Sequence, residues 1–337
     1  MPNDAFKFQG EVSMQHKATI LVLFLLLNGC ATRDIADPAY HSIEPGKLPA
    51  ADVALNIPGL SPCTDSPDHT LHLNASQPVT VLAHGCYGSA GQFRGLAQVL
   101  AFQGQQTICF GYDDRDALTQ SATELRNAVN QLAKQTGAPQ ITVIGHSQGA
   151  LIARKSLTEL PVPAPARPTD LRLVTISGPF NGIAAAQTCG REWLSWATLG
   201  LLPVSCYVAT GAKWLDITNA STFIRKPGEL IPEVSSYLKI DTDETGICRQ
   251  EQNGRCLVSD DVFSLDEQHN PAVDADARAR RVEVRAGHVE IVGDKRMAPL
   301  KLIATLQEQG ILQPTAAESR SAFNRMLSRV YQDETLH

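Results

Sequence analysis

The sequence has no hydrophobic run long enough to cross a bilayer. A transmembrane helix needs about 20 apolar residues, whereas the apolar run near the start of this chain covers only residues 18–27. Basic residues are not in excess either, because 29 Lys and Arg stand against 35 Asp and Glu. The net charge of −6 and the lack of Lys/Arg clusters argue against nucleic acid as a partner.

Motifs that would indicate a cofactor are also missing. The sequence contains no metal-ligand spacing, no phosphate-binding loop and no dinucleotide-binding fingerprint, so it implies no metal and no cofactor. Internal repeats and low-complexity tracts are absent as well. With 337 residues, of which 43% are hydrophobic, the chain is long enough for one large domain with a substantial core.

The most informative segment joins a short strand to a helix. Residues 141–144 are rich in β-branched side chains and predict a buried strand, and residues 147–160 predict a helix. The sequence GHSQG lies between them at 145–149 and has the Gly-x-Ser-x-Gly pattern of a nucleophile elbow.

In such an elbow the strand turns abruptly into the helix and lifts one side chain above the carboxyl edge of the sheet. The turn holds that residue, here Ser147, in a strained backbone conformation. Gly145 and Gly149 are needed because a Cβ at either position would collide with a neighbouring strand or helix. The sequence therefore predicts Ser147 as a nucleophile.

Strands and helices alternate through the rest of the chain. This alternation predicts right-handed crossovers and an α/β fold with a mostly parallel central sheet flanked by helices. Further strands are expected at 70–76, 78–83, 106–112, 171–177, 235–242 and 281–285, and further helices at 90–104, 116–137, 298–309 and 316–331.

The N-terminus has the layout of a secretory signal, in which Lys17 precedes the apolar run. The sequence LNGC at 27–30 resembles the bacterial lipobox, in which the cysteine, here Cys30, is lipidated and becomes the first residue of the mature protein. Ala31 stands where Asp would signal retention in the inner membrane. The resemblance implies a bacterial cell envelope protein held in the outer membrane by a lipid anchor and facing the periplasm.

Three loops resemble those of the α/β-hydrolases, in particular bacterial lipases and esterases. The sequence HGCYGS at 84–89 is similar to their oxyanion loop, and SGPFNG at 177–182 to a lipase loop in which Phe180 replaces the usual His. The resemblance implies that the backbone N–H groups of Cys86 and Gln148 bind the oxyanion.

The same resemblance implies a Ser-His-Asp triad. His288 follows the last strand, where this fold has its catalytic base, and His269 is its nearby competitor. Asp260 precedes two apolar residues by two positions, as the triad acid commonly does, with Asp261 as the fallback. Other acidic residues of this region remain alternatives, namely Asp241, Asp243 and Asp266.

Residues 183–230 occupy the place where this superfamily inserts a cap or lid. All three tryptophans fall in this segment, and an apolar aromatic cap suits a lipid-like acyl substrate. Leaving Cys30 aside, seven cysteines remain. In an oxidising compartment we expect the bridges Cys189–Cys206 and Cys248–Cys256, while the pairing among Cys63, Cys86 and Cys109 stays open.

The expected organisation has four parts. These are a lipoprotein signal peptide at 1–29, a tether with lead-in strands at 30–76, the hydrolase domain at 77–315, and a helical tail at 316–337, with the start left open between Met1 and Met14. The expected activity is hydrolysis of carboxylic esters through an acyl-enzyme. The alternatives are an acyltransferase or thioesterase with the same triad, and a non-enzymatic envelope scaffold.

Overall fold

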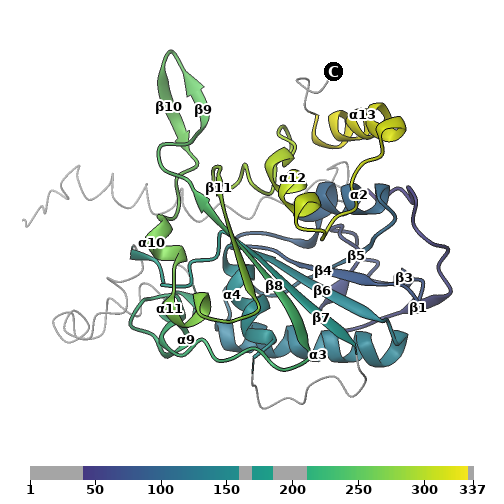
Figure 1. The fold of residues 1–337 in the computed structure, drawn as a ribbon, viewed down its shortest axis with the longest axis horizontal. Coiled ribbons are helices and arrows are strands. Elements are labelled where there is room, and N and C mark those ends of the chain that lie inside the picture. The colour runs from purple at the N-terminus through teal and green to yellow at the C-terminus, as the bar shows by residue number, and fades with distance from the viewer. Residues whose placement is uncertain (1–40, 159–168, 185–210, 333–337) are drawn as a thin grey trace, which may run out of the picture. The chain divides into compact units, whose positions relative to one another are not determined.

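The β-branched and apolar segments assemble into one seven-stranded sheet in the computed structural model, which describes residues 41–158, 169–184 and 211–332 (Figure 1). Its strands are β2 (Leu60–Ser61), β4 (Val79–Ala83), β5 (Gln106–Phe110), β6 (Gln140–His146), β7 (Asp170–Ile176), β8 (Val234–Asp243) and β11 (Ala279–Arg285). They lie in the order β11-β8-β7-β6-β4-β5-β2. Every neighbouring pair is parallel except β2 with β5, which confirms the predicted α/β class and the mostly parallel sheet.

The strand order changes direction beside β4. The chain goes from β4 to β5 on one side and then crosses to β6 on the other. In open α/β sheets, ligands bind at the carboxyl ends of the strands at such a switch point. The loop after β4 and the turn after β6 are therefore the expected place for a site.

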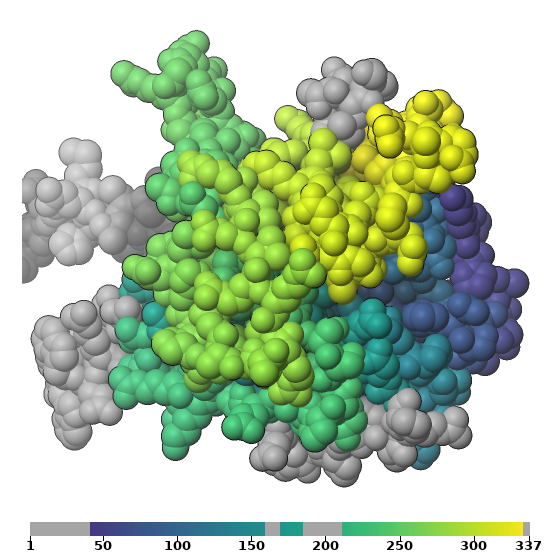
Figure 2. Space-filling view, in the orientation of Figure 1, coloured from purple at the N-terminus to yellow at the C-terminus, as the bar shows by residue number. Residues whose placement is uncertain are grey.

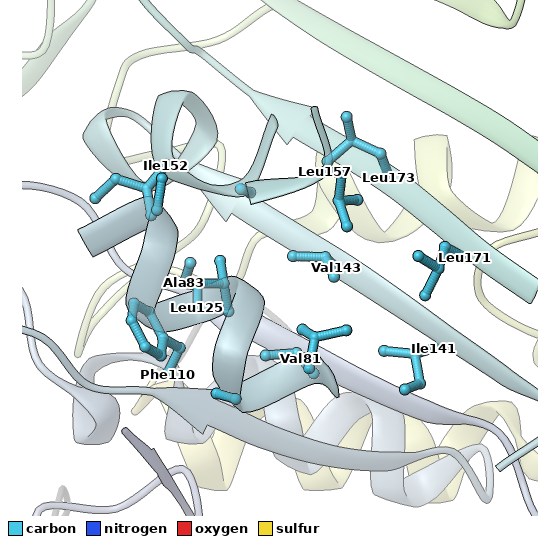
Figure 3. Packing of buried hydrophobic residues seen from close by; sticks show 14 of the residues in the cluster. Val81, Ala83, Phe110, Leu125, Ile141, Val143, Ile152, Leu157, Leu171 and Leu173 are labelled. Carbon is cyan, nitrogen blue, oxygen red and sulfur yellow. The ribbon is translucent and has the colours of Figure 1, made fainter. Parts of the chain in front are cut away.

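Helices cover both faces of the sheet (Figure 1). They are α2 (Arg94–Phe102), α3 (Leu118–Thr136), α4 (Gln148–Ser156), α12 (Leu300–Glu308) and α13 (Arg320–Tyr331). Side chains of α3 and α4 share a core with alternate residues of β4 and β6, such as Val81 and Val143. Figure 3 shows this core. The residues between them, such as Leu82 and Ile144, face the other core, to which α2, α12 and α13 contribute.

The last helices close that second face. Phe323, Met326 and Leu327 of α13 are buried at helical spacing, and Phe323 packs against Phe102 at the end of α2 with ring centroids 5.2 Å apart. Figure 2 shows the C-terminal part of the chain, in yellow, packed on the rest of the molecule. The predicted helical tail is thus part of the hydrophobic core.

The smaller elements lie at the edges of the sheet. β1 (Val53–Leu55) pairs with β3 (Leu71–Leu73), and β9 (Cys248–Gln252) pairs with β10 (Arg255–Ser259) in an exposed hairpin that extends away from the sheet (Figures 1 and 2). Short helices are η2 (Ala90–Phe93), α8 (Lys213–Asp216), α9 (Thr222–Arg225), α10 (Leu265–Gln268), α11 (Pro271–Asp274) and η4 (Ala317–Ser319). The segment expected as a tether with lead-in strands, residues 30–76, thus contains β1, β2 and β3.

Two disulfides occur in the described part of the chain. Cys248–Cys256 joins β9 to β10 and confirms that prediction. Cys63–Cys109 resolves the open pairing and leaves Cys86 as a free thiol. Cys30, Cys189, Cys206, Trp193 and Trp196 lie outside the described residues. Within residues 41–332, gaps aside, no helix is long and apolar enough to cross a membrane.

Candidate active site

Ser147 sits in the turn between β6 and α4. Its backbone angles are φ 57° and ψ −124°, a conformation that residues other than glycine rarely adopt. The Ser147 N–H donates to the Ile176 carbonyl at the end of β7 with an N···O distance of 2.9 Å, which fixes the strained turn. Strain of this kind persists only where the surroundings enforce it, and it is common at active sites.

Close backbone packing explains both glycines of the elbow. A Cβ on Gly145 would lie 2.2 Å from the Gly149 carbonyl oxygen in α4. A Cβ on Gly149 would lie 2.3 Å from the carbonyl oxygens of both Ala83 and His84 at the end of β4. The helix therefore packs on the two strands at a distance that excludes any side chain at these positions.

His288 follows β11 and is 7% exposed. Its Nδ1 lies 2.8 Å from Oε1 of Glu244, whose side chain is fully buried. The ring of Phe263 meets the imidazole edge-on, with centroids 4.7 Å apart. One carboxylate and one aromatic ring thus fix the orientation of the imidazole, with Nδ1 directed at the carboxylate.

Glu244 is the first residue after β8 and is surrounded by donors. Its Oε1 also accepts from the Thr242 hydroxyl at 2.8 Å. Its Oε2 accepts from the backbone N–H groups of Val262 and Phe263 at 2.7 and 2.8 Å. Hydrogen bonds from N–H and O–H groups stabilise the charged form of a buried carboxylate. Glu244 can therefore hold the Nδ1–H tautomer of His288 and stabilise an imidazolium.

The position predicted for Asp260 belongs to Glu244, which corrects the sequence-based assignment. Asp260 is 2% exposed, but its carboxylate accepts from the backbone N–H groups of Val289 and Glu290 at 3.0 and 2.9 Å, and not from the imidazole. Its carbonyl accepts from the His288 N–H at 2.9 Å. Asp260 therefore holds the backbone of the His288 loop and does not contact the ring.

The other candidates do not contact the His288 imidazole. Asp261 accepts from the Gly246 N–H. Asp243 pairs with Arg285, and Asp266 lies in the first turn of α10. Asp241 is buried and pairs with Lys239, and its other carboxylate oxygen lies 3.4 Å from Nε2 of His269.

His146 connects the nucleophile turn to the His288 loop. Its Nε2 lies 2.9 Å from the His288 carbonyl oxygen, and the two imidazole rings are 4.7 Å apart. Because the acceptor is a carbonyl, Nε2 carries the proton. Burial, with a smaller effect from His288, lowers the pKa of His146 well below its usual value of 6.5. The residue is therefore neutral and acts as a fixed donor.

The lowered pKa of His146 predicts that the folded protein loses stability in acid. Below pH 6.5 the unfolded chain binds a proton at His146 and the folded protein does not, so the free energy of unfolding should fall as the pH drops. Urea unfolding at pH 7.5 and 5.0 measures this loss. His146→Gln, which keeps a donor but cannot titrate, should reduce it, whereas His69→Gln at an exposed position should not. Equal losses in the wild type and His146→Gln would contradict the prediction.

The oxyanion loop lies against the same turn. A Cβ on Gly85 would lie 3.0 Å from the Ser147 Cβ, so the loop after β4 lies directly against Ser147. Cys86 follows Gly85, and Gln148 is the first residue of α4. Within the described part of the chain, the backbone N–H groups of these two residues make no hydrogen bond. They are the donors that sequence predicts for an oxyanion.

The loop is held on a second side by His84 and Tyr112. Their rings stack with centroids 4.4 Å apart, and the Tyr112 hydroxyl donates to the His84 carbonyl at 2.7 Å. His84 Nδ1 lies 2.9 Å from the Gly85 carbonyl oxygen. Burial lowers the pKa of His84, so this imidazole also serves as a neutral donor that fixes the loop.

A family model described as alpha/beta hydrolase fold matches residues 78–163, which include the oxyanion loop and the elbow. The chain has the α/β-hydrolase fold. No curated protein sequence matches it.

Solved structures with this fold are similar at low identity. An esterase B from Lactobacillus rhamnosis (HN001) is 14% identical, with a TM-score of 0.50 over 96% of this chain and 99% of that chain. A Bacillus licheniformis lipase in its propeptide form is 13% identical, with a TM-score of 0.50 over 80% of this chain and 55% of that one. Its mature form is 14% identical, with a TM-score of 0.49 over 80% of this chain and 99% of that chain.

Proposed function

We propose that this protein is a serine hydrolase that cleaves carboxylic esters through an acyl-enzyme. The observation that carries the proposal is the strained Ser147 turn, tied through His146 to a base whose imidazole is held by Glu244. A strained serine turn is common at active sites, and a buried carboxylate that orients an imidazole is the arrangement that activates a serine nucleophile. Both occur here at the switch point of an α/β sheet. The similarity to an esterase and a lipase is consistent with an ester substrate.

The mechanism follows from these roles. Glu244 holds Nδ1–H of His288, so Nε2 is free to take the proton of the Ser147 hydroxyl as the oxygen attacks the acyl carbonyl. The N–H groups of Cys86 and Gln148 stabilise the oxyanion, each contributing about 3 kcal/mol. The protonated imidazole then gives its proton to the leaving alcohol. Water, deprotonated in turn by His288, releases the acid and restores Ser147.

Labelling with a fluorophosphonate tests the proposal. The wild-type protein should be labelled, and peptide mapping should find the adduct on Ser147. Ser147→Ala should remove both the labelling and the hydrolysis of a short p-nitrophenyl ester while circular dichroism stays unchanged. A protein that hydrolyses no ester and is not labelled would leave the non-enzymatic envelope scaffold as the better interpretation.

The same residues would also support acyl transfer or thioester cleavage. Product analysis with competing alcohols, and with a thioester of the same acyl group, separates these activities from ester hydrolysis. The apolar residues of the expected cap favour a substrate with a lipid-like acyl group. Of the three tryptophans in this cap, Trp214 lies in the described part of the chain, where it is partly buried against the core.

The proposal includes a lipid anchor on Cys30, which rests on the lipobox-like sequence at 27–30. An acyl chain contributes about 0.8 kcal/mol for each buried CH₂, so several chains hold a protein firmly on a membrane. Cys30→Ser should move the protein from the membrane fraction to the soluble one or leave its precursor uncleaved. Unchanged membrane retention after normal N-terminal processing would exclude the anchor.

A further inference from the structure

A buried lysine lies directly behind the oxyanion loop. Lys213, the first residue of α8, is 1% exposed. Its Nζ lies 2.8 Å from the Cys86 Sγ and 2.8 Å from the Asp114 Oδ2, and 4.9 Å from the centre of the Tyr87 ring. One ammonium therefore contacts two successive residues of the loop that carries an oxyanion donor.

Asp114 joins this lysine to both donors of the oxyanion hole. Its Oδ2 also accepts from the Tyr87 N–H at 2.7 Å, which fixes the peptide plane that follows Cys86. Its backbone carbonyl accepts from the Gln148 side chain at 3.2 Å. The same residue thus touches the Cys86 side and the Gln148 side of the proposed site.

The backbone of the loop needs this support. Tyr87 has φ 57°, a left-handed conformation that costs a non-glycine residue of this size free energy. Its side chain is 81% exposed, so packing of the ring in a core does not compensate for the strain. The contacts that hold the strained residue are the hydrogen bond from its N–H to Asp114 and the ammonium beneath its ring.

We propose that Asp114 and Lys213 are positioning residues that hold the Cys86–Tyr87 backbone in the conformation that binds the transition-state oxyanion. The proposal rests on the proposed hydrolase function and extends it to residues outside the Ser147, His288 and Glu244 group. Neither side chain touches the reacting atoms. They act through the direction of the Cys86 N–H, which must point at the oxygen while charge develops on it.

Electrostatics explains why both charges are needed. Burial opposes the charge on Asp114, but hydrogen bonds from Lys213 and the Tyr87 N–H lower its pKa overall. Burial likewise opposes the charge on Lys213, but hydrogen bonds to Asp114 and Cys86 raise its pKa. At neutral pH the pair is ionised, and removing one partner leaves the other charge, buried for Lys213 and partly buried for Asp114, without compensation.

The experiment compares Lys213→Met and Asp114→Ala with the wild type, because alanine removes the oxygen that accepts from both Lys213 and the Tyr87 N–H. Because an oxyanion donor acts mainly in the transition state, kcat for p-nitrophenyl butyrate should fall about tenfold or more, while KM changes less than about threefold. Hydrogen exchange of the 84–88 peptide should become faster in both variants, and exchange of the β8 amides should not change. Because the two residues act together, the double variant should lose little more than the worse single variant.

Lys155→Met is the matched control. The Lys155 ammonium also lies over an aromatic ring, 5.7 Å from the centre of Phe223, but at the far end of α4 from the elbow. This variant should keep wild-type kcat and loop exchange. If Lys213→Met does not fold, Asp114→Ala, whose side chain is partly exposed in the wild type, decides alone.

The outcomes separate this inference from the proposed function. Wild-type kcat and wild-type loop exchange in folded Asp114→Ala would overturn the inference, and Ser147 labelling in the wild type would leave the hydrolase proposal standing. A kcat loss accompanied by an equal rise in KM and by faster exchange throughout the sheet would indicate a structural role and would overturn it too. A wild-type protein that neither labels nor hydrolyses overturns both.

Discussion

Replacing Glu244 with Gln is expected to lower kcat for ester hydrolysis by about 10³- to 10⁴-fold, with the fold retained. A carboxylate accepts on both oxygens, but an amide accepts on one only. Val262 and Phe263 offer two N–H donors to Oε2, so the amide oxygen should turn toward them. The amide NH₂ then faces His288 Nδ1 and selects the tautomer that cannot take the Ser147 proton. Steady-state kinetics with a p-nitrophenyl ester measures the loss.

Asp260→Asn is the matched control, because it also removes one buried carboxylate near His288. Its contacts are the backbone N–H groups of Val289 and Glu290, and an amide oxygen can keep one of them. This variant should lose stability, seen as a lower urea midpoint, but keep kcat within about tenfold of the wild type. The reverse pattern, with Asp260→Asn inactive and Glu244→Gln active, would restore the sequence-based assignment.

The elements around Ser147 could be predicted because their signals are local. Period-two and period-3.6 patterns predict the six parallel strands of the sheet and the longer helices that cover it to within a few residues. The elbow is a five-residue pattern. Its two glycines are required because Gly145 packs against the first turn of α4 and Gly149 packs against the end of the neighbouring strand β4. The Cys248–Cys256 disulfide could also be predicted from local sequence, because the two cysteines are eight residues apart and close a hairpin.

The acid could not be read from a local pattern, because its position depends on how distant segments meet. Glu244 lies one residue beyond β8, and the loop at 260–263 wraps around its carboxylate. The resemblance therefore identified the right loop but the wrong carboxylate, since Phe263 of that loop does contact His288. The end of β8 is a partial signal, because the carboxyl ends of parallel strands share one edge. Beyond the predicted strand at 235–242, however, Asp243 comes before Glu244, so this signal alone does not select Glu244.

The pairing of Cys63 with Cys109 stays open in the sequence for a similar reason. It depends on β2 pairing antiparallel with β5, where Ser61 lies opposite Cys109. β2 has only two residues, too few to show a period-two pattern. The sequence around it therefore indicates a tether and not a strand. Short edge strands of this kind are specified by the partner strand and not by their own sequence.

Gly149→Ala is expected to destabilise the protein by about 3 kcal/mol or more, a large part of the roughly 5–15 kcal/mol that stabilises a typical domain. The new Cβ would lie 2.3 Å from two carbonyl oxygens, those of Ala83 and His84. Both belong to the backbone at the end of β4, inside the parallel sheet, and neither can rotate away as a flexible side chain would. Relief requires α4 to move off the sheet, which would also displace Ser147 and the Gln148 N–H.

Gly111→Ala is the control for this substitution. Gly111 follows β5, and a Cβ there would meet nothing within 4 Å. Its N–H bond to the Gly59 carbonyl involves only the backbone and is kept. This variant should unfold in urea within about 0.5 kcal/mol of the wild type. If Gly149→Ala unfolded at the same midpoint as Gly111→Ala and kept wild-type kcat, α4 would not be packed on β4 as tightly as the elbow geometry requires.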